Sequence, residues 1–219
     1  AATVYRQLMT YDFRRGDTLV TVGGGVLQDL SGFVASTMYR GVRWCLVPTT
    51  LLAQADSCVG GKNAINMDGW KNQIGTFYPP DEVWIDPSWL STLSERAFRS
   101  GLAEIIKIHL ISGEDTCDKL AAFLKRGDLR EVSALSQMIE SSLNLKKNIV
   151  EADECDHGRR QFLNYGHCLG HALESVSGYA LTHGEAVLFG MAFANEMAQA
   201  CGLMSESTSE YIGELLAPF

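Results

Sequence analysis

Long hydrophobic runs are missing from this 219-residue sequence, and so is any excess of positive charge. A membrane-spanning helix needs roughly 18 uninterrupted apolar residues, and the chain holds no such stretch. Its net charge of −8, from 18 Lys and Arg against 26 Asp and Glu, argues against a nucleic-acid-binding surface. We therefore expect neither a membrane nor nucleic acid as a partner. A local basic pocket for an anionic small molecule stays compatible with these numbers.

The two ends lack the features of a complete or exported chain. Residues 1–6 do not form a basic region followed by an apolar core, so they are not a secretory signal. There is no initiator methionine, and the sequence stops abruptly after residues 215–219. We expect a trimmed chain or a fragment.

Paired cysteine motifs are also missing. None of the six cysteines belongs to a Cys-x-x-Cys pair. In a chain of this length without a signal, scattered cysteines are typical of reduced thiols. The sequence therefore predicts a cytoplasmic protein.

The first part of the chain alternates short β-rich runs with glycine-rich turns. We expect buried strands at 18–22, 44–47 and 83–85. The first runs into Gly23–Gly25 and then into an apolar helical pattern that continues to Met38. This alternation predicts an α/β unit with a largely parallel sheet.

After residue 86 the pattern is helical to the end. Apolar residues such as Leu135, Met138 and Ile139 recur at helical spacing in a polar background. The sequence thus predicts an α/β domain at 1–86 and an all-α domain at 87–219. A site built from both would lie in the cleft between them.

Two segments of the first part are candidates for binding a nucleotide. Gly23–Asp29 follows a strand and opens a helix, where the backbone can approach a phosphate closely. It departs from the dinucleotide fingerprint because Gln28 stands at the position of the last glycine, so a purely structural turn is the alternative. Thr49 and Thr50 follow the next strand, where hydroxyls line a ligand crevice or cap a helix.

Lysines and asparagines gather around a diglycine in this acidic chain. Lysines bind phosphate as point charges and asparagines fix hydroxyls, whereas isolated lysines are usually solvated surface residues. The grouped polar residues are Asp56, Lys62, Asn66, Lys71 and Asn72.

Glu104 and Lys107 lie three residues apart, and so on one face of an otherwise apolar helix. They form either a buried ion pair or a ligand with a catalytic cation, and the sequence leaves both open.

Histidines cluster near the end of the chain. Three of the five, His167, His171 and His183, fall within 17 residues, and the first two share a helix face. No glutamate follows His167, which disfavours a zinc peptidase, and Cys168 points about 100° away on the helix. A catalytic zinc keeps three protein ligands, which two or three of these histidines with Glu104 would supply. The sequence predicts a metal site here.

Taken in order, these segments resemble the dehydroquinate synthase family, within the sugar-phosphate cyclases, over nearly the whole chain. The segments that carry the resemblance are GGGVLQDLSGF, RGVRWCLVPTTLLAQADSCVGGKNAIN, WKNQIGTFYPP, GLAEIIK, FLNYGHCLGHALE and THGEAV. The resemblance implies a Rossmann-like α/β N-terminal domain, an all-α C-terminal domain and a homodimer. It also implies that the first strands of the nucleotide domain, and last helices carrying a further lysine, are missing.

The resemblance also implies roles for individual residues. The metal ligands would be Glu104, His167 and His183. NAD would lie against Gly24, Gly25, Asp29, Thr49, Thr50, Asp56, Lys62 and Lys71. The substrate would be held by Asp56, Lys62, Lys71, Asn72, Lys107, Lys146, Arg160, Asn164 and His171, and the partner subunit's substrate by Arg40. The catalytic set within these would be Asp56, Lys62, Lys107, Arg160, Asn164 and His171.

Three positions depart from the family pattern. Asp156 stands where the family has a glutamate, and Asn63 and Cys168 stand where threonine is common. The shorter Asp156 side chain puts its part in a proton relay in doubt. The other two lie next to site residues and could change substrate preference.

The implied reaction is a step of the shikimate pathway of aromatic amino acid biosynthesis. It converts 3-deoxy-arabino-heptulosonate 7-phosphate to 3-dehydroquinate and phosphate by transient NAD oxidation, phosphate elimination, reduction and aldol closure. A divalent metal, zinc or else cobalt, acts as Lewis acid.

Three alternatives stay open. Deoxy-inosose and valiolone synthases share this chemistry, although Asn164 and the Gly-Gly-Lys run favour dehydroquinate synthase. A metal-dependent glycerol or alcohol dehydrogenase needs no phosphate pocket, so the lysine set argues against it. A non-catalytic interaction module is the third alternative.

Overall fold

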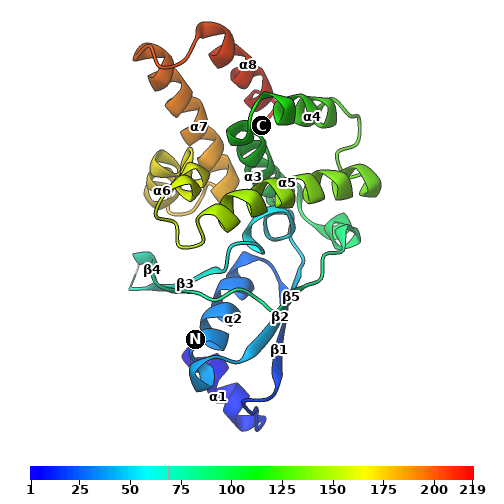
Figure 1. Cartoon of the computed structure of the whole chain (residues 1–219), viewed down its shortest axis with the longest axis vertical. Helices are drawn as coiled ribbons and strands as arrows, with labels where there is room; N and C mark the ends of the chain where they lie inside the picture. Colours follow the sequence, from blue (N-terminus) through cyan, green and yellow to red (C-terminus); the bar gives the residue numbers. More distant parts are fainter. Residues whose placement is uncertain (69) are drawn as a thin grey trace.

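The computed structural model describes residues 1–68 and 70–219. Figure 1 shows an elongated molecule with a small sheet and its helices at one end and a group of longer helices at the other. The predicted fold class, a Rossmann-like α/β part followed by helices, is confirmed. Among the described residues, no helix is both long enough and apolar enough to cross a bilayer.

A three-stranded parallel sheet forms the first part, in the order β1 (Thr18–Gly23), β2 (Arg43–Pro48), β5 (Glu82–Val83). The first two strands arise from apolar runs that a glycine turn and a proline end, as the sequence predicts. The third is shorter than the predicted strand at 83–85. The helical elements of this part are α1 (Ala2–Thr10), α2 (Gly25–Thr37), η1 (Met38–Arg40) and η2 (Ala53–Ser57).

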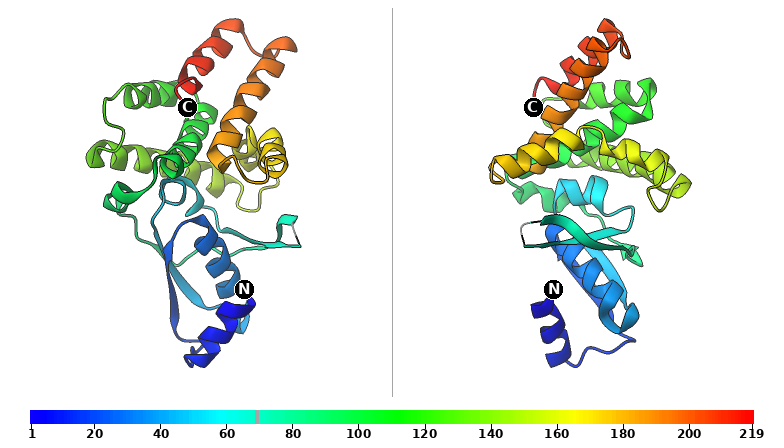
Figure 2. Two further views of the ribbon diagram at one scale, coloured as in Figure 1. Left: turned by 180° about the vertical axis from the view of Figure 1, so that it is seen from behind. Right: turned by 90° about the vertical axis from the view of Figure 1, so that its left-hand side faces the viewer.

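An antiparallel hairpin of β3 (Lys62–Met67) and β4 (Trp70–Phe77) projects to the side between the two parts (Figures 1 and 2). It packs on α2 through a close approach. A Cβ at Gly32 would overlap the side chain of Asn63, whose amide donates to the carbonyls of Gly61 (3.0 Å) and Tyr78 (2.8 Å). Asn63 therefore fixes the base of the hairpin.

Helices account for the rest of the described chain, and α3 (Glu95–Ser112) lies at their centre. The Ser94 hydroxyl caps its start, and Gly113 ends it. Leu102, Ile105 and Ile106 of α3 are fully buried in the larger hydrophobic core. The other elements are η3 (Pro87–Thr92), α4 (Glu114–Leu124), α5 (Val132–Ala152), η4 (Arg159–Asn164), α6 (His167–Val176), α7 (His183–Ala200) and α8 (Glu206–Leu216).

The domain division at residue 86 stays a prediction. At this point the chain passes from β5 to η3, and the Asp86 carboxylate accepts a hydrogen bond from the Ser88 amide. A second, smaller core around Trp44 and Leu46 lies on the sheet side of this point.

Candidate metal and anion site

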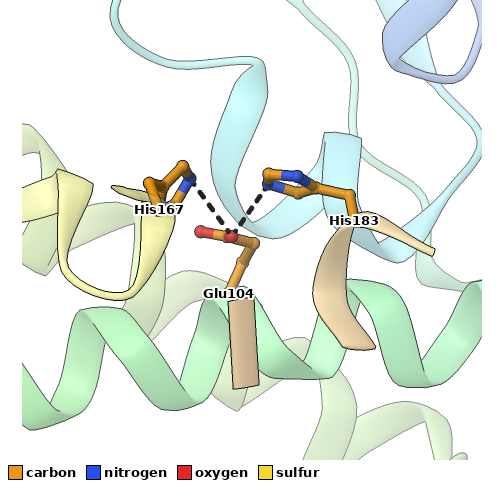
Figure 3. Close-up of side chains that lie close together, drawn as sticks. All are labelled: Glu104, His167 and His183. Atoms are coloured by element: carbon orange, nitrogen blue, oxygen red, sulfur yellow. Dashed lines mark ion pairs between the residues drawn. The ribbon is translucent and has the colours of Figure 1, made fainter. Parts of the chain in front are cut away.

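Three helices bring Glu104, His167 and His183 to one point (Figure 3). Glu104 lies in the middle of α3, whereas the two histidines are the first residues of α6 and α7. A reciprocal capping box between Thr182 and Glu185 fixes the start of α7. The position of His183 is thereby set by the helix terminus rather than by a flexible loop.

Glycines let these helices touch backbone to backbone. A Cβ at Gly184 would overlap the backbone of Ser100 on α3, and the Gly184 amide donates to the Ser100 hydroxyl at 3.0 Å. Gly166, just before α6, adopts the left-handed conformation (φ 78°), and a Cβ there would lie 2.6 Å from the Val187 carbonyl oxygen. A Cβ at Gly190 would in turn overlap the Gly166 carbonyl. Close backbone approaches at these glycines therefore set the spacing of the three site residues.

The three side chains have the geometry of a metal-binding set. Oε1 of Glu104 lies 3.2 Å from Nε2 of His183 and 3.8 Å from Nε2 of His167. All three ligand atoms lie within 4.8 Å of one another. One carboxylate and two imidazoles are a donor set that suits zinc and leaves a position open.

Charge in this cluster is buried and concentrated. Glu104 is fully buried, and neither of its carboxylate oxygens has a hydrogen-bond partner of good geometry among the described residues. Burial raises the pKa of this carboxyl, but Lys107 and the two histidines outweigh it and hold the pKa below its usual range. A buried anion with unsatisfied oxygens is what a divalent cation would complete, so these residues fit a metal.

The surroundings shift the pKa values of the two histidines in opposite directions. Burial and the Lys107 charge lower the pKa of His167 to about 4, which leaves it neutral. Burial also opposes charge on His183, but Glu104 and Glu174 outweigh it and raise the pKa of His183 to about 9. His183 therefore carries a positive charge that, together with Lys107, faces Glu104.

The sequence left two interpretations of Lys107 open, and the structure shows a buried ion pair with Glu104. Its side chain is 3% exposed and is not among the residues that line the adjoining cavity. Lys107 thus acts on Glu104 directly.

A cavity of about 510 Å³ lies beside the cluster, between the β3–β4 hairpin and the helices. Most of the polar residues predicted to bind substrate line it. They are Asp56, Lys62, Lys71, Asn72, Lys146, Arg160, Asn164 and His171, together with Asp29, His167 and His183.

Carboxylates neutralise the lysines of this cavity. Lys146 lies 2.8 Å from Asp56, and the ammonium of Lys71 lies within 3.0 Å of both oxygens of Glu174. Lys62 forms an ion pair with Asp156, the residue that departs from the family glutamate. The like-charge repulsion of gathered lysines is therefore offset within the chain.

Arg160 spans the two parts of the molecule. Its side chain donates to the carbonyls of Gly60, at 2.7 Å, and Glu154, and Arg160 is 3% exposed. Gly60 has a φ of 116°, which favours glycine, and a Cβ there would overlap the Arg160 guanidinium. Arg160 therefore stabilises the diglycine turn, and the lack of a side chain at Gly60 leaves room for the guanidinium.

Half of the residues predicted to contact NAD follow the carboxyl ends of β1 and β2, namely Gly24, Gly25, Thr49 and Thr50, whereas the others line the cavity. The Thr49 amide donates to the Gly23 carbonyl at 3.0 Å, and a Cβ at Gly24 would lie 2.8 Å from Thr50. Thr50 also accepts a hydrogen bond from the Ala53 amide at 3.3 Å, the capping role left open by the sequence. Gly25 faces open space.

Gln28 explains the departure from the glycine fingerprint. Its side chain donates to the Ser57 carbonyl at 2.6 Å and accepts from the Ser57 hydroxyl at 2.8 Å. This pair ties α2 to η2 next to Asp56. At the next residue of α2, burial raises the pKa of Asp29 to about 6.

Arg40 does not join the residues lining the cavity. It lies exposed at the end of η1 with a left-handed backbone (φ 66°). Its predicted role in a partner's site stays a prediction.

Glu174 is the site residue that sequence reasoning missed. It is 4% exposed and contacts Lys71 and His183. The available signal was its spacing, since a residue seven after His167 and three after His171 shares their helix face.

This chain is similar to known proteins over its whole length. A family profile described as 3-dehydroquinate synthase N-terminal matches residues 1–100, and one described as 3-dehydroquinate synthase C-terminal matches residues 101–219. A 3-dehydroquinate synthase of Clostridium perfringens (strain 13 / Type A) is 42% identical over 217 residues. The match covers 99% of this chain and 61% of that protein.

Solved structures of related cyclases are also similar. A 2-deoxy-scyllo-inosose synthase complexed with carbaglucose-6-phosphate, NAD+ and Co2+ has a TM-score of 0.90 at 30% identity, covering 99% of this chain and 59% of that one. A 2-epi-5-epi-valiolone synthase from Streptomyces hygroscopicus subsp. jinggangensis 5008, with NAD+ and Zn2+ bound, has a TM-score of 0.88 at 29% identity, covering 98% and 61%.

Proposed function

Since the chain belongs to the 3-dehydroquinate synthase family over both of its parts, we propose that it carries the active site of a metal- and NAD-dependent cyclase that makes 3-dehydroquinate. The proposed substrate is 3-deoxy-arabino-heptulosonate 7-phosphate, and phosphate is the second product. The chain spans 61% of the length of the Clostridium relative. The proposal therefore concerns the enzyme of which these residues form the site.

The observation that carries the proposal is the meeting of two features. Glu104, His167 and His183 form a metal-binding set, and a cavity lined by Lys62, Lys146 and other polar residues adjoins it. A dehydrogenase acting on glycerol or a simple alcohol would need the first feature but not the second. A phosphorylated, polyhydroxylated substrate needs both.

We assign Glu104, His167 and His183 as ligands of one divalent metal, zinc or cobalt. We assign Gly24, Gly25, Asp29, Thr49 and Thr50 to NAD, because glycines at a helix N-terminus admit a pyrophosphate. When bound, NAD would supply reversible oxidation of a substrate hydroxyl, and the metal a Lewis acid that acidifies it.

The chain's own residues orient and neutralise the substrate. Lys62 and Lys146 would exchange their present carboxylate partners for the anionic groups of the substrate, which favours departure of phosphate as its charge develops. Burial and the charge of Lys71 lower the pKa of His171, which keeps its imidazole neutral and able to accept a proton near pH 7. Asn164 and Asn72 line the same cavity and would bind hydroxyls.

Arg160 and Asp56 hold this arrangement in place. Arg160 fixes the diglycine turn that precedes Lys62, and Asp56 fixes Lys146. Lys107 balances the charge of Glu104, and Lys71 that of Glu174. Their part in the reaction is to keep the site preorganised.

A homodimer in the cytoplasm completes the proposal. Arg40, exposed at the end of η1, would reach the partner subunit's site. The six cysteines, all within the described residues, are free thiols, which supports a reducing compartment.

Other sugar-phosphate cyclases are the second candidate, because two of them resemble this chain structurally at 29% and 30% identity. Product analysis separates the candidates. The full-length protein, loaded with NAD and zinc, is supplied with the heptulosonate phosphate, glucose 6-phosphate or sedoheptulose 7-phosphate. We expect 3-dehydroquinate from the first and no carbocycle from the others. A carbocyclic product from either of the others alone would reassign the substrate.

A further inference from the structure

Glu174 occupies a buried position between the β3–β4 hairpin and the metal-binding set. We propose that Glu174 is a positioning residue, which orients the His183 ring through Nδ1, on the side opposite Glu104, and also pairs with Lys71. This inference rests on the metal site proposed above. It adds a residue to which neither the sequence motifs nor the comparisons give a role.

The His183 ring lies between two carboxylates. Nε2 is 3.2 Å from Oε1 of Glu104, and Nδ1 is 3.5 Å from Oε1 of Glu174. Among the described residues Nδ1 has no hydrogen-bond partner of good geometry. Metal-ligating histidines usually donate their second N–H to a carboxylate, which fixes the tautomer and the ring orientation. At 3.5 Å this contact is longer than a hydrogen bond of good geometry, and hydrogen bonds in unloaded sites are often long and shorten on loading.

Glu174 is a buried carboxylate, which has to be paired. The residue is 4% exposed, on the face of α6 that also carries His167 and His171. Burying an ionised carboxylate is costly unless it is paired. Lys71 supplies that pair, since its ammonium lies 3.0 and 2.9 Å from the two Glu174 oxygens. A carboxylate held in this way is a strong hydrogen-bond acceptor for His183.

Lys71 distinguishes a positioning role from metal ligation. His171, Glu174 and His183 present ligand atoms within 4.8 Å of one another, which is the geometry of a second metal site. The Lys71 ammonium, however, lies 3.0 and 2.9 Å from the two Glu174 oxygens and supplies the positive charge there. Both Glu174 oxygens thus have a hydrogen-bond partner, whereas among the described residues neither Glu104 oxygen has one of good geometry, so one metal, at Glu104, is expected.

The same pair connects the two parts of the molecule. Lys71 belongs to β4 and Glu174 to α6, 103 residues apart in sequence. Through Glu174, the position of the hairpin that walls the cavity is coupled to the orientation of a metal ligand.

The test measures metal binding directly, on the full chain stripped of metal and titrated with Zn2+ against a chelating dye. We expect Glu174→Ala to weaken zinc binding by about 10–100-fold. Glu174→Gln keeps an oxygen acceptor and should bind zinc at least about tenfold more tightly than Glu174→Ala. His183→Ala is the reference for complete loss, and Glu196→Ala, an exposed carboxylate on α7, is the control expected to match wild type.

A second readout follows the ring itself. In zinc-loaded protein with 15N-labelled histidine, we expect one tautomer of His183, protonated at Nδ1, and a mixture of forms in Glu174→Ala. If Glu174→Ala does not fold, Glu174→Asp, which withdraws the carboxylate by one methylene, should show the same weakening.

Two results would overturn the inference. Wild-type zinc affinity in Glu174→Ala would show that the residue positions nothing. Loss as complete as in His183→Ala, in both the Ala and the Gln variants, would make Glu174 a ligand. Neither readout depends on turnover, so a protein that shows the expected pattern but converts no sugar phosphate would refute the proposed function alone.

Discussion

Glu104 shows how one buried carboxylate can determine the state of a whole site. Lys107, 3% exposed, is the lysine paired with it, and the histidines complete its surroundings. Without a metal, the stability of the fold depends on these cations. With a metal, the same carboxylate has a stronger partner.

Replacing Lys107 with Met should therefore destabilise the metal-free chain. Breaking a buried pair by removing one partner costs about 3–5 kcal/mol, because the remaining charge is left uncompensated. Zinc should restore most of this loss, since it takes over the neutralisation of Glu104. Thermal unfolding with EDTA and with zinc measures both effects. Equal destabilisation in the two conditions would separate Lys107 from the metal site.

Asp29 predicts a pH dependence of folding. Burial raises its folded-state pKa to about 6, above that of the unfolded chain, against weaker opposing contributions from the Ala64 backbone and Lys71. The folded state therefore binds the proton more tightly, and the free energy of unfolding falls as pH rises from about 4 to 6, by about 1–3 kcal/mol. In Asp29→Asn this contribution disappears. Urea unfolding at pH 4.5 and 7 measures it, and an unchanged difference between the two pH values would contradict the assignment.

At the scale of elements, the glycine turn between β1 and α2 leaves open space in front of the N-terminus of α2. Gly25→Val adds a branched side chain where a Cβ meets nothing within 4 Å, so the fold should be kept. The side chain would occupy the approach to the helix N-terminus, and we expect the dissociation constant for NAD to rise at least about tenfold, or 1.4 kcal/mol. Calorimetric titration measures it.

Gly213→Val, in α8, is the matched control, because a Cβ there also meets nothing within 4 Å. Its NAD affinity should equal that of the wild type. Wild-type affinity in Gly25→Val as well would leave the turn with a structural role only.

Some elements could be predicted from local sequence and others could not. Strands β1 and β2 are apolar runs with clear ends, and they appear where expected. The β3–β4 hairpin contains Lys, Asn and Gly, which are poor strand formers, and it owes its form to pairing and to packing on α2. Helix α1 was not predicted, although it is amphipathic and packs Tyr5 and Leu8 against the smaller core.

The candidate site divides in the same way. Residue type, clustering and helical spacing indicated Glu104 and the three histidines, whereas the resemblance was needed to choose His167 and His183 as the ligands. Asp156 and Glu174 lie 94 and 103 residues from the lysines they contact, so only the folded chain reveals these pairings.

At the scale of the whole molecule, polar contacts tie the region of Asp56–Lys71 to the helices. Four basic side chains each contact a residue at least 90 positions away in the sequence: Lys62, Lys71, Lys146 and Arg160. The cavity is therefore neutralised before any substrate arrives, and an anion has to compete with carboxylates of the chain.

Binding of a phosphonate analogue of the substrate tests this competition. Lys146→Met should weaken binding by about 1.5–3 kcal/mol, the range for a hydrogen bond to a charged group. Lys147→Met is the matched control, since Lys147 is 60% exposed and lies near Glu151 on the same helix. Calorimetry at low and moderate salt gives both affinities. If Lys146→Met binds like Lys147→Met, the cavity does not hold the anion through this lysine.

The backbone contacts among α3, α6 and α7 have a consequence for how this protein can change over evolution. Because Gly166, Gly184 and Gly190 hold the helices together without side chains, apolar residues elsewhere in the core can be exchanged while the ligand spacing stays the same. The cost is that these three positions admit almost no substitution. A lineage that adapts its core to a new temperature can therefore keep its metal chemistry, as long as these glycines are retained.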